Sequence, residues 1–419
     1  MDIVFIAHYA GSPKHGMVYG HYHLARQWVE SGHTVTIVAA SHSHTRFNQP
    51  KIEERITEEF IDGIRYLWLR TRSYKPSGNI ARAANIFSFV LQCWFRSLPI
   101  ANAEMVICSS HYPFAIHPAR KLARRFGARL VFEVRDLWPL TLVELGGASS
   151  KHPFIRLMQY SENYAYRIAD RVVSVLPFAK NYMVEHGMNK DKFLFIPNGI
   201  DVAEDNKEEV LPIEYYKMLE ELKAAGRFLI GYAGKVGLSN VLHPFIEGVA
   251  KSADANVHAV IIGDGALLPE LRMLTEDLKV DERVTFLDPV SRAQIRHFLS
   301  FMDAGYVGYQ KQPLYRFGIS PTKVNDYMLA ALPIIYAVEA PGDVVAESGA
   351  GISCRAEDSD AISDAIMSLR KLSQDELRAM GLRGREWLIA NRDYKILASR
   401  FLEHAMDPPE LLSRAPLRT

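Results

Sequence analysis

The chain has 419 residues, of which 48% are hydrophobic and 23% charged, and this length predicts two domains of about 200 residues each. Its formal net charge of +1 gives no global field that would attract nucleic acid, so we expect no nucleic-acid partner. The three cysteines, Cys93, Cys108 and Cys354, are far apart in sequence. Their odd number and spacing disfavour a disulfide framework or a zinc site and indicate a reducing compartment.

The chain opens directly on a predicted strand, without the basic and apolar regions of a signal peptide. It contains no run of about 18 uncharged apolar residues, the minimum for a spanning helix. The longest apolar segment, residues 86–95, is too short to cross a bilayer and ends at Arg96. We therefore expect a cytoplasmic protein, and contact with the inner surface of the cytoplasmic membrane is left open.

Short β-branched runs alternate with helical patterns almost throughout the chain, which is typical of βαβ units and parallel sheets. The continuous apolar character of these runs predicts strands that are covered on both faces. Helical patterns lie between them, for example over residues 20–31 and 118–126. We predict strands in the first half at 2–7, 34–40, 64–69, 105–108, 129–134, 171–175 and 193–196, and in the second half at 228–234, 257–262, 284–287, 304–307, 333–337 and 350–353.

The alternation stops after residues 197–201, and the acidic stretch 202–211 has no apolar periodicity. The sequence therefore predicts an α/β protein of two doubly wound parallel sheets, with both sets of strand C-termini facing one cleft. Helices are expected over 375–405, and the last of them is free to cross back to the first domain. The predicted divisions are a first domain at 1–200, a linker at 201–226, a second domain at 227–390, a C-terminal helix at 391–407 and a tail at 408–419.

A long loop, residues 8–19, follows the first predicted strand. Gly11 and Gly16 allow the backbone to approach a ligand closely, and the next helix offers a positive N-terminus. The loop is not a G-x-G-x-x-G fingerprint, and no suitably placed acidic residue follows the second strand, so a dinucleotide cofactor is disfavoured. The alternative is an ordinary loop between a strand and a helix.

Polar residues also follow two other strands of the first half. Arg135 and Asp136 come directly after the strand at 129–134, and His111 follows the strand at 105–108. Side chains at such positions in an α/β sheet often face the ligand crevice. The alternatives are an ion pair between the neighbouring Arg135 and Asp136, and a solvated loop histidine.

Glycine-bearing turns follow the first two strands of the second half. Lys235 lies between Gly234 and Gly237, where its ammonium can neutralise a diphosphate held close to the backbone. Gly263 and Asp264 repeat the pattern one strand later. We assign Gly234, Gly263 and Asp264 to contacts with a nucleotide, although a surface lysine and an aspartate that forms a turn explain the same residues.

The most informative segment is residues 316–327, RFGISPTKVNDY. Ser320 is a good N-cap and Pro321 a good first helical residue, so a helix start is expected here. Its free N–H groups and Lys323 form an anion site, and Asp326 lies one turn further on the same face, where it can bind ribose hydroxyls. The alternative is a capped helix with an ion pair between Lys323 and Asp326.

The motifs EVRDLWP, PNGID, YAGKVG, IIGDG and FGISPTKVNDYMLAALP, in this order, resemble the family-four retaining glycosyltransferases of GT-B fold. The similarity covers residues 1–405 and is greatest to the branch that builds bacterial O-antigen, capsule and exopolysaccharide, including N-acetylfucosaminyltransferase-like members. The resemblance implies that a nucleotide-sugar, with a UDP-sugar favoured, binds mainly to the second domain. It also implies that Lys235 stabilises the departing diphosphate and that Asp326 holds the ribose. The backbone from Gly318 through Ile319 and Ser320 to Thr322 would meet the phosphates and the donor sugar.

The chain departs from the family pattern in three places. Gly318 stands where the first acid of the family's E-x7-E pair belongs, so the usual contact to the donor sugar is missing or comes from elsewhere. The second basic residue, a few places after Lys235, is absent, and Lys323 can supply that charge. Arg135, followed by Asp136, replaces the family's histidine, so no residue is identified as a general base. We expect Lys235, Arg135 and Asp136 to be the catalytic residues, with Arg135 acting electrostatically.

The resemblance implies transfer of a hexose or N-acetylhexosamine to a lipid-diphosphate-linked saccharide, without a cofactor or bound metal. Lys235, Lys323, Ser320, Thr322 and Gly16 are assigned to the diphosphate, and His111 to the acceptor side. Residues 86–100 could rest on an anionic membrane surface, or form a buried helix with a solvated basic face. Two other functions are considered: a UDP-N-acetylglucosamine 2-epimerase, which alone would alter the sugar without an acceptor, and a non-catalytic sugar-nucleotide-binding protein.

Overall fold

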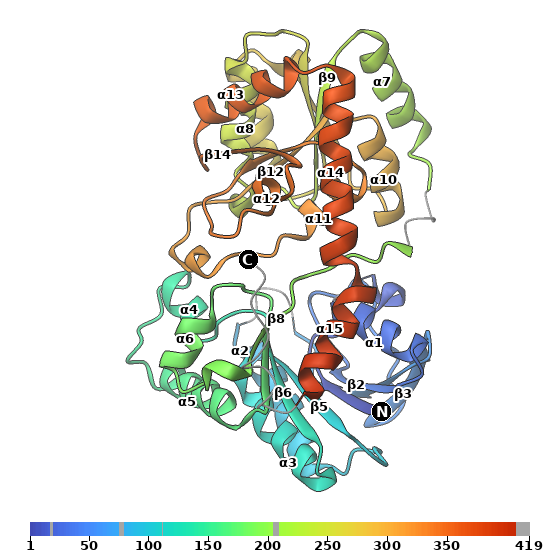
Figure 1. Cartoon of the computed structure of the whole chain (residues 1–419), viewed down its shortest axis with the longest axis vertical. Helices are drawn as coiled ribbons and strands as arrows, with labels where there is room; N and C mark the ends of the chain where they lie inside the picture. The colour runs from blue at the N-terminus through green and yellow to red at the C-terminus, as the bar shows by residue number, and fades with distance from the viewer. Residues whose placement is uncertain (17–19, 75–78, 111, 204–208, 408–419) are drawn as a thin grey trace. The chain divides into compact units, whose positions relative to one another are not determined.

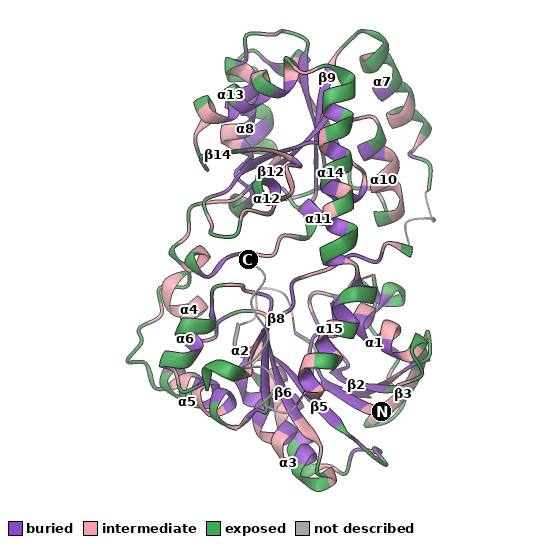
Figure 2. Cartoon of the chain, viewed as in Figure 1, coloured by how far each residue is buried: buried purple, intermediate pink, exposed green. Residues whose placement is uncertain are grey.

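The structure is a computed structural model that describes residues 1–16, 20–74, 79–110, 112–203 and 209–407 (Figure 1). The chain forms two compact units. Met1–Asn198 and the segment from Tyr394 onward make the first, and Gly199–Asp393 makes the second. Each unit is built on one sheet whose strands are mostly buried (Figure 2). The α/β class with two parallel sheets, predicted from the alternation of strands and helices, is confirmed.

The first unit has an eight-stranded sheet of order β3-β4-β2-β1-β5-β6-β7-β8. β3 pairs with β4 in antiparallel fashion, and the other pairings are parallel. β3 was not predicted, although Asp62 and Gly63 both have positive φ and form the Asp-Gly turn that favours a hairpin. The strands are β1 (Asp2–Ile6), β2 (Thr34–Ala40), β3 (Ile56–Ile61), β4 (Ile64–Leu69), β5 (Met105–Ser110), β6 (Arg129–Val134), β7 (Arg171–Ser174) and β8 (Phe193–Phe195).

Helices cover both faces of this sheet. On one face Trp28 of α1 stacks on Phe5 and donates its indole N–H to the Ala398 carbonyl of α15, 3.0 Å away. Helix α15, the last helix in the described part of the chain, is therefore part of the core of the first unit. The helices are α1 (Gly20–Glu30), α2 (Asn79–Phe95), α3 (Ile116–Phe126), α4 (Leu140–Glu144), α5 (Pro153–Ile168), α6 (Lys180–Glu185) and α15 (Tyr394–Met406), with 3-10 turns η1 (Pro13–His15), η2 (Pro113–Ala115) and η3 (Lys190–Lys192).

The second unit has a six-stranded parallel sheet of order β11-β10-β9-β12-β13-β14. Its strands are β9 (Phe228–Ala233), β10 (Val257–Ile262), β11 (Val284–Leu287), β12 (Ala304–Gly308), β13 (Ile334–Ala337) and β14 (Gly351–Cys354). Its helices are α7 (Ile213–Ala224), α8 (Leu242–Lys251), α9 (Leu268–Asp277), α10 (Arg292–Ser300), α11 (Thr322–Leu329), α12 (Val344–Ser348), α13 (Ser359–Arg370) and α14 (Gln374–Arg392), with turns η5 (Leu238–Asn240), η6 (Asp281–Arg283) and η7 (Pro313–Phe317).

The segment expected to be a linker, residues 201–226, contains helix α7. Leu219 of this helix is fully buried in the core of the second unit. The stretch without apolar periodicity ends before Pro212, and apolar residues beyond it pack α7 on the sheet. The expected linker was therefore too long, because it included an element of the second unit.

Strand order reverses once in each sheet, between β1 and β5 in the first unit and between β9 and β12 in the second. The loops that leave the two strands at such a switch point run to opposite faces of the sheet, which opens a crevice at the carboxyl ends of the strands. The segments that follow β9, β10 and β12 are therefore the first place to look for a ligand site in the second unit.

Candidate functional site

The turns after β9 and β10 are locked together through their backbones. The Val236 N–H donates to the Asp264 carbonyl over 2.8 Å. A Cβ atom on Gly263 would overlap the carbonyl of Gly234, and both glycines have positive φ, 152° and 141°. The glycines that follow these two strands are thus required because the backbones of the two turns are in contact. The Asp264 side chain is exposed beside these turns.

Lys323 connects helix α11 to the end of β9. Its Nζ donates to the Tyr232 hydroxyl at 2.9 Å and to Oδ1 of Asn240. The Tyr232 hydroxyl and Nδ2 of Asn240 both donate in turn to the Lys235 carbonyl, at 2.6 and 3.0 Å. The lysine chain passes over Gly234, where a Cβ atom would lie 2.7 Å from its Cε. One hydrogen-bonded network, which we call the Lys323 cluster (Tyr232, Gly234, Lys235, Asn240 and Lys323), therefore lies at the switch point.

The ammonium of Lys323 is held by neutral partners and aromatic rings. It lies 4.6 Å from the ring centroid of Tyr232 and 5.9 Å from that of Tyr309. Burial lowers the pKa of Lys323 to about 8, because the surroundings solvate the charged form poorly. An anion beside Nζ would compensate this charge. The Lys235 side chain, by contrast, is exposed to solvent.

Helix α11 begins one residue later than expected. Pro321 is its N-cap residue, with φ −72° and ψ 126°, and a proline side chain offers no hydrogen bond to cap this end. The prediction that Ser320 caps the helix was wrong; it and Ile319 are half-buried ahead of the helix. Since proline has no N–H, the donors at this end are the amides of Thr322, Lys323 and Val324.

Gly318 has a backbone conformation that explains why no acid stands there. It follows η7 with φ 80° and ψ 170°. This region of backbone space is essentially restricted to glycine. A glutamate at position 318 would be strained in this loop, so the departure from the family pattern has a conformational cause.

Asp326 does not pair with Lys323. Its Oδ1 lies 3.0 Å from Nη2 of Arg292, and the Asp326 side chain is 29% exposed. The alternative of an ion pair within the first turns of α11 was therefore wrong. The Lys323 side chain is hydrogen-bonded to Tyr232 of β9, whereas the Asp326 side chain is hydrogen-bonded to Arg292 of α10. Both side chains nevertheless remain on the first two turns of one helix.

In the first unit, the Arg135 guanidinium is bound by two side chains and lies close to the start of α1. Its Nη1 is 3.3 Å from Oε1 of Glu133, and its Nη2 donates to Oδ1 of Asn198 over 2.7 Å. A Cβ atom on Gly20, the first residue of α1, would lie 3.3 Å from Arg135 Nη1. Asp136 is exposed. Arg135 pairs with Glu133 rather than with Asp136, the partner in the alternative interpretation.

Glu133 is the buried centre of this arrangement. Its Oε2 lies 3.0 Å from Nε2 of His21, which is also 2.6 Å from the Ser109 hydroxyl. Burial opposes ionisation of Glu133, but His21 and Arg135 hold its pKa well below the usual range. Sequence reasoning did not single out Glu133 or His21. The available signal was one charged residue inside an otherwise apolar strand, since a buried charge needs a partner.

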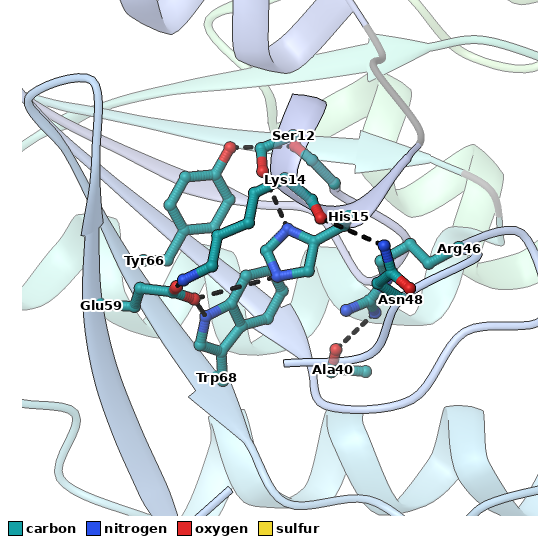
Figure 3. A network of polar contacts seen from close by, with 10 residues as sticks. Ser12, Lys14, His15, Ala40, Arg46, Asn48, Glu59, Tyr66 and Trp68 are labelled. Atoms are coloured by element: carbon teal, nitrogen blue, oxygen red, sulfur yellow. Dashed lines mark hydrogen bonds and ion pairs between the residues drawn. The ribbon is translucent and has the colours of Figure 1, made fainter. Parts of the chain in front are cut away.

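The loop after β1 rests on a polar network around Glu59 (Figure 3). Lys14 and His15 both approach the Glu59 carboxylate, which also accepts the indole N–H of Trp68 over 2.8 Å. Nδ1 of His15 is 2.8 Å from the Ser12 hydroxyl. Side chains from β3 and β4 therefore fix the described part of the loop.

Gly16 ends the turn η1 in the left-handed region, with φ 68°. It is exposed, and a Cβ atom there would lie 2.9 Å from the Phe47 ring. The backbone conformation at position 16 thus favours glycine, independently of any contact with a ligand. His111, which was expected on the acceptor side, lies outside the described residues. Within the described ranges, no group of three or more His, Cys, Asp or Glu side chains is placed to hold a metal ion.

Comparisons with known families match both units. Residues 15–199 match the glycosyl transferase 4-like domain, and residues 227–371 match the glycosyl transferases group 1. A comparison with curated protein sequences gives no match. The chain is thus recognised as a glycosyltransferase in each half separately.

Solved structures share the whole architecture at low sequence identity. The chain is similar to HepE of Anabaena in complex with UDP and glucose (16% identity, TM-score 0.63, covering 96% of this chain and 98% of that one). It is similar to sucrose-phosphate synthase of Thermosynechococcus elongatus (14%, 0.68, 99% and 100%). The E. coli trehalose-6-phosphate structure bound with UDP-2-fluoro glucose is also similar (12%, 0.73, 97% and 100%).

The fold and the two matched domains define a glycosyltransferase of GT-B fold, and the sequence-based expectation of this class is confirmed. Within that class, the first unit matches the glycosyl transferase 4-like domain and the second unit matches the glycosyl transferases group 1.

Proposed function

We propose that the enzyme transfers a hexose or N-acetylhexosamine, with retention, from a UDP-sugar to a lipid-diphosphate-linked saccharide in cell-surface polysaccharide assembly. The Lys323 cluster carries this proposal, because it places a half-buried cation at a helix start, at the switch point of the second unit. HepE of Anabaena has been seen with UDP and glucose, and the E. coli trehalose-6-phosphate structure with UDP-2-fluoro glucose. These neighbours support a uridine diphosphate donor.

The diphosphate would be held by two kinds of donor. Lys323 offers a cation whose burial already disfavours its charge, and α11 offers the amides of Thr322 to Val324 with the positive end of the helix dipole. Lys235 is exposed beside them and is free to reach the same phosphates and to neutralise the departing diphosphate. Gly16 and Ser320 remain proposed phosphate contacts.

Asp326 is the proposed ribose anchor. A carboxylate has about four lone-pair sites, so its single bond to Arg292 leaves acceptors for ribose hydroxyls. Gly234, Gly263 and Asp264 would border the nucleotide, and the backbone at Gly318 and Ile319 the sugar. Because a side chain at 318 is excluded by conformation, sugar recognition there is assigned to the backbone.

On the acceptor side, Arg135 is proposed to stabilise the negative charge that develops during transfer. Glu133 and Asn198 fix its guanidinium, and His21 fixes Glu133, so the charge is preorganised. The bond from the anomeric carbon to the diphosphate breaks as the acceptor oxygen bonds to that carbon. The leaving phosphate can take the acceptor proton, so the scheme needs no protein base. Asp136 remains a candidate catalytic residue beside Arg135, and His111 a candidate on the acceptor side.

Helix α2 supports contact with an anionic membrane surface. Among the described residues, no helix is long and apolar enough to cross a bilayer. The segment 86–100 has a buried side, including Phe89, and an exposed side on which Leu91 and Phe95 lie open to solvent. Lys121 of α3 donates to the Trp94 carbonyl over 2.6 Å and lies over its ring, which adds positive charge beside the apolar side chains. Binding to phosphatidylglycerol vesicles that is lost in Phe95→Ser would support this contact.

The transfer itself is tested by following UDP release from UDP-sugars, with and without membranes that contain lipid-linked saccharides. Lys323→Met and Lys235→Ala should each lower turnover by about 100-fold, as expected for loss of one preorganised charge contact. Lys371→Ala is the control, since this exposed lysine lies on the same unit just after α13. Wild-type rates in both test variants, with unchanged thermal transitions, would exclude the assigned site.

A further inference from the structure

A cavity large enough for a small ligand lies within the first unit. A cavity of about 390 Å³ opens between α4 and the first half of α5, helices labelled in Figure 1. Helix α4 follows β6 and Arg135, and α5 leads from this edge back to β7, so the cavity lies at the carboxyl edge of the sheet. Ligands of open α/β sheets bind at this edge.

The lining of the cavity combines apolar and hydrogen-bonding surfaces. Leu140 and Val143 of α4 contribute apolar side chains, while Arg156, Gln159 and Asn163 of α5 contribute a guanidinium and two amides. Tyr160, which is 59% exposed, adds an aromatic ring. A pyranose ring has the same two-sided character, with C–H groups on its face and hydroxyls around its rim. A purely apolar ligand would leave the guanidinium and amides unpaired.

The two amides are fixed in a defined orientation. Nε2 of Gln159 donates to Oδ1 of Asn163 over 2.7 Å and to Oε2 of Glu162 over 2.8 Å. In the hydrogen bonds that the structure describes, these contacts leave Oε1 of Gln159 and Nδ2 of Asn163, one acceptor and one donor. Such a pair matches a sugar hydroxyl, which both donates and accepts.

Glu162 fixes the orientation of the Gln159 amide. Its carboxyl is buried and accepts hydrogen bonds from the Tyr166 hydroxyl at 2.9 Å and the Tyr182 hydroxyl at 3.0 Å. Burial raises the pKa of Glu162 to about 7, against the effect of these hydrogen bonds. Two tyrosine hydroxyls hold the buried carboxyl, which in turn holds Gln159 without help from a ligand, and preorganised polar groups bind at a lower entropic cost.

We propose that this cavity binds one sugar ring of the acceptor saccharide, an inference that rests on the glycosyl transfer proposed above. Tyr160 would contact the face of the ring, and Gln159 and Asn163 its hydroxyls. The cavity would thereby select the acceptor at a position separate from the Lys323 cluster of the second unit.

Saturation-transfer NMR on the full chain tests this assignment. The probes are octyl β-D-glucoside, octyl β-D-galactoside and octyl N-acetyl-β-D-glucosaminide, with an octyl oligoethylene glycol ether as a probe without a sugar. We expect saturation of the ring protons of at least one glycoside, falling to the level of the sugar-free probe in Tyr160→Ala and in Asn163→Leu. Leu157→Ala is the matched control, because Leu157 is exposed on the same helix and does not line the cavity.

The inference is overturned if no glycoside shows ring saturation, if the signal persists in Tyr160→Ala and Asn163→Leu, or if the sugar-free probe gives an equal signal. Thermal transitions of all variants are compared to confirm that they fold. UDP binding is measured by calorimetry on the same samples. If the wild type does not bind UDP, the result counts against the proposed donor site alone. If it binds UDP but gives no ring saturation with the glycosides, the result counts against the cavity alone.

Discussion

Donor binding should depend on pH through Lys323. The pKa of this ammonium is lowered to about 8 by burial, so about 90% of it is charged at pH 7 and about 10% at pH 9. If only the ammonium form binds the diphosphate, the Kd for UDP should rise about tenfold between these two pH values. The sign follows from linkage, because a bound anion favours the protonated lysine and deprotonation at higher pH removes that contact.

Isothermal titration calorimetry with UDP at pH 7, 8 and 9 measures this effect. Lys323→Arg is the comparison, since a guanidinium stays charged throughout this range. The ratio of the two affinities at each pH also cancels the ionisation of the nucleotide itself. Equal pH dependence in wild type and Lys323→Arg would refute the argument that a partly buried lysine binds the diphosphate.

Three further changes test other parts of the structure. The pKa of Glu162 is raised from 4.5 to about 7, so ionisation of this carboxyl destabilises the folded state as the pH rises. Between pH 4.5 and 7, the free energy of unfolding in urea should therefore fall by about 3 kcal/mol more in the wild type than in Glu162→Gln. The same pH dependence of this free energy in both proteins would contradict the argument. Gly318→Ala should lower the free energy of unfolding by about 1 to 3 kcal/mol, because φ is 80° there, and an unchanged urea midpoint would count against the strain. Glu133→Gln should lower the free energy of unfolding by about 3 kcal/mol at pH 7, because it leaves Arg135 and His21 without their buried carboxylate. An unchanged free energy of unfolding in urea would contradict this.

The strands could be predicted well because they are buried on both faces. Runs such as 34–40 and 257–262 are predominantly apolar, and they form β2 and β10 with the predicted limits. The edge strand β3 was missed, because its residues alternate between partly buried and exposed positions and two glutamates interrupt the apolar pattern. Helix α7 was missed for a similar reason, since only Leu219 is fully buried along it.

The candidate site was only partly predictable. The local sequence indicated a helix start and a cation near residue 320. This was possible because the effects of capping residues and of the helix dipole are confined to about one turn, so the residues involved are close in sequence. The partners of Lys323 lie 91 and 83 residues away, so Tyr232 and Asn240 had no sequence signal that joined them to it. The cap itself was misplaced by one position, because Pro321 occupies the N-cap and Ser320 lies outside the helix.

Hydrogen exchange with and without UDP tests the central claim most directly, because it reports where on the full chain the nucleotide binds. The account predicts slower exchange of amides in residues 234–240, 263–265 and 318–324, and loss of this protection in Lys323→Met. Protection confined to other segments, or equal protection in wild type and Lys323→Met, would contradict the placement of the donor diphosphate at the Lys323 cluster.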